Sequence, residues 1–231
     1  MKHSKKNSKV KGQKSKVVIF LGPPGSGKGT QAKLLAKKYR LEYFGSGMAL
    51  RERQKVNDFT GKKIGEVMER GEWMPESVIC RLWMNKLEEF KNKRFNGFIY
   101  DGGPRRRLEA EIFDVALEWY EWQDVKVIFI KISKKESLHR LTKRRQCKRC
   151  GRIIPWLGEF KKLQKCDRCG GELIIRADDT IGAIKKRLEE FEKETMPTIN
   201  YYKKQDRVIE INGEQPIEDV FKDVLKALQA A

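Results

Sequence analysis

Residues 17–30 read VVIFL and then GPPGSGKGT, a short apolar run joined directly to a glycine-rich loop. A continuous apolar run of this length is typical of a parallel strand that is buried on both faces. The loop has the spacing G-x-x-x-x-G-K, and a helical pattern follows it in residues 31–39. Strand, loop and helix in this order predict a phosphate-binding loop rather than a glycine-rich turn that holds no ligand.

The chemistry of such a loop follows from its glycines and its lysine. Glycines let the backbone turn its N–H groups toward phosphate oxygens, and the N-terminus of the next helix adds partial positive charge. Lys28 is expected to reach the β- and γ-phosphates of a nucleotide. Gly29 stands where the strict pattern has Ser or Thr, and Thr30 comes one position later. The residues predicted to bind phosphates here are Gly22, Gly25, Ser26, Gly27, Lys28, Gly29 and Thr30.

The rest of the chain alternates between apolar runs and helical patterns. This alternation predicts an α/β fold, a doubly wound parallel sheet with helices on both faces. The helix expected over 181–202 carries one apolar stripe at spacings of three, four and seven. Strands are expected at 17–21, 97–101, 125–132 and 207–211, and the other helices at 31–39, 64–70, 76–90, 109–122, 135–145 and 218–228.

The charge balance favours anionic partners. The chain has 231 residues, 36% of them charged, and a net charge of +19. Residues 1–16 contribute +7 with no acidic residue, so they are expected to form a disordered basic tail, and +12 remains in the rest. An excess of this size suits nucleotides or nucleic acid, although solubility explains the tail equally well.

The apolar content places the chain among cytoplasmic globular proteins. Apolar residues make up 39% of the chain and aromatic residues 10%, which argues against a disordered protein. No apolar run approaches the ~18 residues that a membrane span needs. The basic N-terminus also lacks the apolar stretch of a signal peptide, so we expect a cytoplasmic location and no membrane partner.

Four of the five cysteines form two C-x-x-C pairs, with fifteen residues between the pairs. In a chain without a secretory signal, this spacing predicts a tetrahedral zinc site rather than disulfides. Cys80 is left over in an apolar stretch, where a buried, inert thiol is expected. The predicted ligands are Cys147, Cys150, Cys166 and Cys169.

The phosphate loop, together with five further segments, resembles the adenylate kinase family of nucleoside monophosphate kinases. The family also places Gly before Thr at the end of the phosphate loop. The similarity covers about residues 17–229. Its segments are GPPGSGKGT (22–30), FGSGMALR (44–51), GEWMP (71–75), GFIYDGGPR (97–105), RADD (176–179) and KRL (186–188).

The resemblance implies reversible transfer of the γ-phosphoryl group of Mg·ATP to a nucleoside monophosphate, with AMP favoured over the other monophosphates. It also implies a monomeric kinase core over 17–231 that contains a helical monophosphate-binding insert over 46–75. A lid over 146–176 would close on ATP, and its zinc would be structural because metal ligation can replace an apolar core in a small unit.

The resemblance also assigns roles to individual side chains, among them arginines, whose planar fork can grip two phosphate oxygens at once. Asp101 would orient water bound to magnesium, and Arg140, Arg144 and Gln215 would add to the ATP site. The catalytic set would be Lys28, Arg105, Arg144, Arg176 and Arg187. The monophosphate site would contain Ser46, Arg51, Trp73, Met74, Gly102, Arg105, Glu109, Arg176 and Arg187.

Three positions depart from the family pattern at the acceptor site: Met48 replaces Asp, Gly103 replaces Phe, and Glu109 replaces the Gln that contacts adenine. A carboxylate only accepts hydrogen bonds, so facing adenine N1 it would cost ~1–3 kcal/mol if buried. Guanine offers N–H donors that suit a carboxylate. The sequence therefore predicts a weakened preference for AMP, with GMP as the alternative acceptor, unless Glu109 turns away from the base.

A different class of function stays open at this point. The basic tail and the basic residues around the cysteine pairs would also suit a binding protein that uses a zinc ribbon on RNA or DNA. Turnover separates the two interpretations. A kinase forms ADP from ATP and a monophosphate, whereas the binding protein shows salt-dependent nucleic-acid affinity without turnover.

Overall fold

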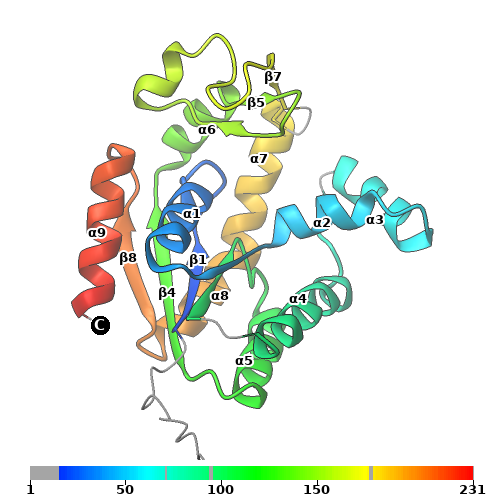
Figure 1. Cartoon of the computed structure of the whole chain (residues 1–231), viewed down its shortest axis with the longest axis vertical. Coiled ribbons are helices and arrows are strands. Elements are labelled where there is room, and N and C mark those ends of the chain that lie inside the picture. The colour runs from blue at the N-terminus through cyan, green and yellow to red at the C-terminus, as the bar shows by residue number, and fades with distance from the viewer. Residues whose placement is uncertain (1–15, 71, 94–95, 177–178, 231) are drawn as a thin grey trace, which may run out of the picture.

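The structure, a computed structural model, describes residues 16–70, 72–93, 96–176 and 179–230. Its centre is a parallel sheet of five strands in the order β2-β3-β1-β4-β8 (Figure 1). The predicted α/β class with a parallel sheet is confirmed. Because β1 lies between β3 and β4, the loops that follow these three strands meet at one edge of the sheet. The strands are β1 (Lys16–Leu21), β2 (Glu42–Gly45), β3 (Gly97–Asp101), β4 (Asp124–Lys131) and β8 (Val208–Asn212).

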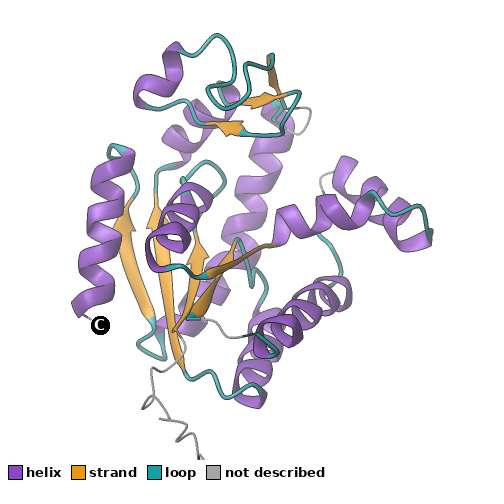
Figure 2. Ribbon diagram, viewed as in Figure 1, coloured by secondary structure: helices purple, strands orange, loops and turns teal. Residues whose placement is uncertain are grey.

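β1 is buried on both faces because its side chains alternate between two cores. Val17, Ile19 and Leu21 join one core, and Val18 and Phe20 join the other. Helices cover both faces of the sheet (Figure 2). On the Val18 side lie α1 (Lys28–Tyr39) and α9 (Ile217–Ala230), and on the Val17 side lie α4 (Glu76–Lys91), α5 (Arg107–Trp119) and α8 (Met196–Lys203).

Two segments project from this core (Figure 1). One is an arm formed by α2 (Ser46–Gln54) and α3 (Phe59–Glu69), inside the segment 46–75 predicted to bind the monophosphate. The other, which we call the lid, is a small antiparallel sheet in the order β6-β5-β7. It follows α6 (Lys134–Thr142) and precedes α7 (Ile181–Glu190). Its elements are β5 (Arg145–Cys147), β6 (Ile153–Ile154), the 3-10 helix η1 (Gly158–Lys162) and β7 (Leu173–Ile175).

Some element boundaries differ from the sequence-based expectation. β1 begins at Lys16, so that residue belongs to the sheet, and residues 1–15 of the predicted tail lie outside the described part of the chain. The helix expected over 135–145 ends at Thr142, because Arg145 already pairs in the lid sheet. β2 and α2 were not predicted as separate elements.

The helix expected over 181–202 is not continuous. Between α7 and α8 the backbone widens into the π-helical turn η2 (Phe191–Thr195). Pro197 is the second residue of α8 and has no backbone N–H. It therefore cannot donate the hydrogen bond that a continuous α-helix requires at this position. None of the helices within the described ranges is both long and apolar enough to cross a membrane.

Phe20→Ala should lower the free energy of unfolding by ~3–5 kcal/mol, because the substitution leaves a cavity between the sheet and α1. The matched control is Phe59→Ala at the start of α3, which should change stability by less than ~0.5 kcal/mol. The two phenylalanines are 0% and 82% exposed, respectively. Urea denaturation of both variants measures the difference, and equal losses would contradict the assigned burial.

Candidate active site

The phosphate loop joins β1 to α1 at the edge where the parallel strands end. Gly22, Gly25 and Gly27 all have positive φ angles, and Gly27 is the N-cap of α1 with φ 88°. The hydroxyl oxygen of Ser26 is buried and has no hydrogen-bond partner among the described residues. Backbone N–H groups and an unused hydroxyl therefore surround the start of the helix, as an anion-binding loop requires. Thr30 lies in the first turn of α1, where its N–H donates to the Gly27 carbonyl at 2.9 Å.

Gly29 is explained by the close approach of Asp101. A Cβ atom at Gly29 would lie 2.9 Å from Oδ2 of Asp101, closer than side chains pack. The hydroxyl of Tyr43 on β2 donates to the same oxygen and fixes the carboxylate in place. The absence of Ser or Thr at this position therefore lets Asp101 lie directly beside the phosphate loop.

Lys28 lies half-buried at the start of α1, with Nζ 3.4 Å from the Pro23 carbonyl oxygen. Desolvation lowers the pKa of Lys28 to about 8, while the carboxylate of Asp101 acts to raise it and Arg105, Arg187 and Arg144 act to lower it. The structure thus brings Lys28 together with three of the predicted arginines and with Asp101. Several cations at one point can neutralise several phosphate charges.

Asp179 holds two of these arginines. Its carboxylate accepts from Nε and Nη2 of Arg144 at 2.8 and 2.6 Å, and from Nη1 of Arg187 at 3.2 Å. The Asp179 side chain is 0% exposed, so this carboxylate is available only to its two partners. Sequence reasoning quoted Asp179 inside a motif but gave it no role. The signal was an acidic residue just after the lid in a chain rich in arginine. Arg176 is half-buried nearby, and its carbonyl accepts from the Asp179 N–H at 3.1 Å.

The predicted acceptor residues gather around the turn that follows β3. Ser46 donates from Oγ to the Gly102 carbonyl at 2.9 Å, and Arg105 donates from Nε to the same oxygen at 2.6 Å. The Arg105 guanidinium lies 5.7 Å from the centre of the Trp73 ring. Lys28, Trp73, Gly102 and Arg105 line one pocket, together with Arg187. Met74 is buried next to Trp73, whereas Arg51 and Met48 are exposed on α2.

Glu109 is buried at the start of α5, and both of its carboxylate oxygens already have donors. Oε1 accepts from the Tyr100 hydroxyl at 2.7 Å, and Oε2 accepts from the Arg105 backbone N–H at 2.8 Å. Burial raises the pKa of the Glu109 carboxyl. The side chain is therefore held inside the protein by these two donors and does not extend into solvent.

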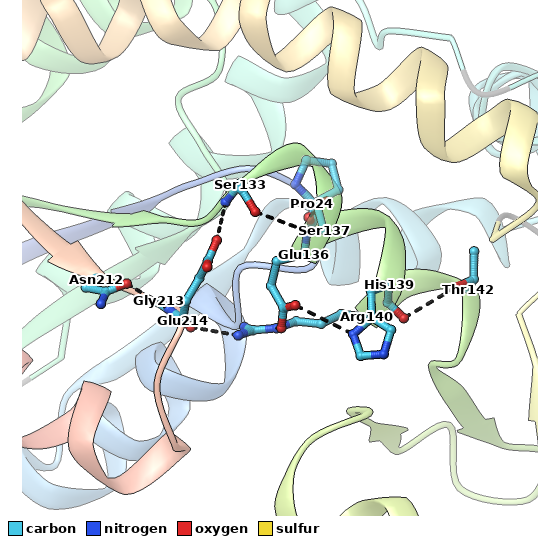
Figure 3. Close-up of polar contacts among 10 residues, drawn as sticks. All are labelled: Pro24, Ser133, Glu136, Ser137, His139, Arg140, Thr142, Asn212, Gly213 and Glu214. Carbon is cyan, nitrogen blue, oxygen red and sulfur yellow. Dashed lines mark hydrogen bonds and ion pairs between the residues drawn. The ribbon is translucent and has the colours of Figure 1, made fainter.

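The remaining predicted ATP residues lie around α6 (Figure 3). Ser137 donates from Oγ to the Pro24 carbonyl, which ties α6 to the phosphate loop. Arg140 is buried and donates to Glu136 at 2.6 Å and to the Gly213 carbonyl at 2.9 Å. These contacts hold Arg140 against the loop after β8. Gln215 lies in that loop and donates to the Asn212 carbonyl and to Asp223, each at 2.9 Å.

The four paired cysteines converge in the lid, with all Sγ atoms within 4.8 Å of one another. The Sγ separations are 3.5 Å for Cys147 and Cys169 and 3.6 Å for Cys150 and Cys166. Tetrahedral coordination with Zn–S bonds of ~2.3 Å places sulfurs about 3.8 Å apart, so the cluster fits such an ion. The Cys150 N–H also donates to Cys147 Sγ at 3.4 Å, which lowers the pKa of that thiol.

Each cysteine pair closes the same turn. Gly151 and Gly170 follow the two pairs with φ angles of 69° and 68°. Their N–H groups donate to the carbonyls of Cys147 and Cys166 at 2.9 and 2.8 Å. The repetition explains why a glycine follows each C-x-x-C pair. Cys80 is separate from the cluster and only half-buried, not fully buried as expected, and burial raises its pKa to about 11.

A glycine loop between the first strand and helix, with a lysine among arginines, defines a P-loop nucleotide-binding protein. The chain matches the family model for adenylate kinase over residues 20–207. It is 39% identical over 212 residues to an adenylate kinase of Caldanaerobacter subterraneus subsp. tengcongensis, covering 91% of this chain and 95% of that protein. An adenylate kinase of Caldicellulosiruptor bescii is 38% identical over 91% of this chain and 98% of that protein. One of Archaeoglobus fulgidus is 36% identical over 92% and 97%. The chain belongs to the adenylate kinase family.

Gly29→Ser should weaken ATP binding by about tenfold, because the new Cβ lies too close to Asp101 and displaces it from Tyr43. The added hydroxyl cannot relieve a contact made by the Cβ atom itself. Gly182→Ser on α7 is the control, since nothing lies within 4 Å of a Cβ there. Titration with a fluorescent ATP analogue gives both affinities. If Gly29→Ser binds as tightly as the control, Asp101 does not require the glycine.

Proposed function

We propose that this protein catalyses reversible transfer of the γ-phosphoryl group of Mg·ATP to AMP, which yields two molecules of ADP. The observation that carries the proposal is the convergence of Lys28, Arg105, Arg144 and Arg187 beside Asp101 at the phosphate loop. The relatives named adenylate kinase, which match nearly the full length of the chain, support the same activity.

Phosphoryl transfer depends on positioning and charge neutralisation more than on covalent chemistry. The backbone N–H groups of the phosphate loop would hold the β-phosphate, and Lys28 would bridge the β- and γ-phosphates. When the more highly charged phosphates bind, Arg144 and Arg187 would break their hydrogen bonds to Asp179 or divide them between Asp179 and the phosphates. Arg176 adds a further cation. Asp101, oriented by Tyr43, would hold water on the magnesium ion that enters with ATP.

The acceptor enters from the side of the arm. Arg105 and Arg51 would bind the phosphate of AMP, and Ser46 and Gly102 shape the turn beneath it. Trp73 and Met74 would lie against the nucleoside. The pocket shared by Trp73, Arg105 and Lys28 supports this placement, because it connects the acceptor side to the phosphate loop.

On the donor side, Arg140 and Gln215 would border the ATP base, since both are fixed in or against the loop after β8. The lid would close over ATP, exclude water and so prevent hydrolysis. Cys147, Cys150, Cys166 and Cys169 would hold a zinc ion in the lid. That ion supplies folding stability and takes no part in the transfer.

The direct test is an assay of ADP formation from ATP with AMP, GMP, CMP and UMP in turn. We expect the highest kcat/KM with AMP, and loss of turnover by orders of magnitude in a folded Lys28→Ala variant. Formation of ADP from none of the four would overturn the kinase assignment. Steeply salt-dependent binding of nucleic acid without turnover would instead support the nucleic-acid-binding alternative.

Lys28 gives a pH dependence of known sign. With its pKa lowered to about 8, Lys28 in the free enzyme is charged below that pH and loses its proton above it. kcat/KM for ATP should therefore fall about tenfold per pH unit above pH ~8. Bound phosphates stabilise the charged form, so the corresponding decline in kcat should begin at higher pH. The measurement is steady-state kinetics over a range of about pH 6 to 10. A kcat/KM for ATP that stays flat over this range would contradict the prediction.

Freshly purified, reduced protein should contain one zinc per chain. Removing zinc with a chelator should melt the lid at a lower temperature than the core, because the core has its own apolar strands. Cys150→Ser should abolish stoichiometric binding, whereas Cys80→Ser should retain it, since Cys80 lies outside the cluster. Elemental analysis together with calorimetry measures both effects. Wild-type protein without metal would refute the assignment.

A further inference from the structure

Arg105 lies in the turn after β3, and hydrogen bonds hold both its backbone N–H and its backbone carbonyl. The Arg105 N–H donates to Oε2 of Glu109 at 2.8 Å, and its carbonyl accepts from Oγ1 of Thr198 at 3.0 Å. Its own Nε closes the turn on the Gly102 carbonyl at 2.6 Å. The guanidinium is thus directed by a backbone held in place from α5 and α8, while the side chain itself remains exposed.

Both carboxylate oxygens of Glu109 accept hydrogen bonds from within the protein. One oxygen holds the Arg105 N–H and the other accepts from Tyr100, and the residue is only 5% exposed. Tyr100 in turn is completely buried, with ring centroids 5.2 Å from Phe44 and 5.1 Å from Phe113. A nucleobase would have to reach a carboxylate that lies behind the turn and already has two donors.

Tyr100 and Gly103 form one steric unit with this carboxylate. A Cβ atom at Gly103 would overlap the hydroxyl oxygen and ring of Tyr100. Gly103 does not have a positive φ angle, so the contact with Tyr100, whose atoms are the three nearest to such a Cβ, is what excludes a side chain there. The ring cannot move aside, because it is packed between aromatic neighbours and bonded to Glu109. Hence Tyr100, Gly103 and Glu109 depend on one another.

We infer that Glu109, supported by Tyr100, is a positioning residue that acts through Arg105 and does not recognise the base of the monophosphate. This inference rests on the proposed kinase function. It replaces the expectation that the Glu109 carboxylate sets the preference between AMP and GMP. Its consequence is that changes at Glu109 affect all monophosphates equally and leave the ATP site unaffected.

Glu109→Gln separates the two roles. A Gln side chain can accept from the Arg105 N–H with its oxygen and donate to the Tyr100 oxygen with its amide. The ratio of kcat/KM for AMP to that for GMP should therefore stay within about twofold of wild type. The matched control is Glu111→Gln on the same helix, where the side chain is 45% exposed and pairs with Arg107. A change in the ratio of more than about threefold, absent from the control, would show that Glu109 recognises the base.

Glu109→Ala removes the acceptor for the Arg105 N–H. We expect kcat/KM for every monophosphate to fall about tenfold, with KM for ATP and the circular dichroism spectrum unchanged. Retention of activity by Glu109→Gln would be the rescue by a conservative change. Wild-type kinetics in Glu109→Ala would overturn the inference. If Glu109→Ala does not fold, Tyr100→Phe is the substitute, because it removes only one donor to Glu109. It should lower kcat/KM less, and by the same factor for all monophosphates. A loss confined to one base would overturn the inference.

The steric unit is tested by a double-mutant cycle. Gly103→Ala should lower the Tm, and adding Tyr100→Leu should recover part of that loss, because the shorter side chain leaves room for the new methyl group. Additive losses would show that Tyr100 does not exclude a side chain at 103. If wild type forms no ADP from any monophosphate, the proposed function fails. A shifted base ratio in an active enzyme overturns only the inference on Glu109.

Discussion

Repulsion among like charges at one edge of the sheet is the constraint on which the site depends. Desolvation lowers the pKa of Lys28 to about 8, and Arg105, Arg187 and Arg144 act in the same direction. Such a cluster is unfavourable without anions, because like charges that lie close together repel one another. Asp101 and Asp179 partly offset the repulsion. The site is therefore arranged to gain most when several phosphate groups arrive together.

The carboxylate of Asp179 also brings the two ends of the lid together. Arg144 comes just before the first strand of the lid, and Asp179 comes shortly after its last strand. Their bidentate pair, with N–O distances of 2.8 and 2.6 Å, therefore joins the two ends of the lid. Leu141 of α6 packs with Ile184 and Leu188 of α7, which joins the two helices that flank the lid. The base of the lid therefore shares its ion pairs with Arg144 and Arg187, the arginines proposed to bind the phosphates, so the proposed closure of the lid would change their surroundings.

Local signals predicted much of the fold and placed the loop that the candidate site is built around. The apolar run 17–21 and the glycine loop placed β1 and α1 in the right order, although α1 begins three residues earlier than predicted, at Lys28. β2 was missed since it is four residues long and includes Glu42 at its start. The contacts of Glu109 could not be predicted, because they depend on the Tyr100 hydroxyl of β3 reaching α5 and on the absence of a side chain at Gly103. Asp179 was overlooked for the same reason, since its partners lie 35 and 8 positions away.

The lid follows a different rule from the core. Within its described residues only Cys147, Ile154 and Cys166 are buried, whereas apolar side chains such as Ile175 stay exposed. So small an apolar interior cannot hold a sheet of short strands together, because ordering each residue costs ~1–2 kcal/mol of conformational entropy. A metal ion held by four cysteines, as proposed, supplies the missing stability from inside the lid. Because that stability would not come from packing against the core, the proposed closure over ATP would not require the lid to lose its own fold.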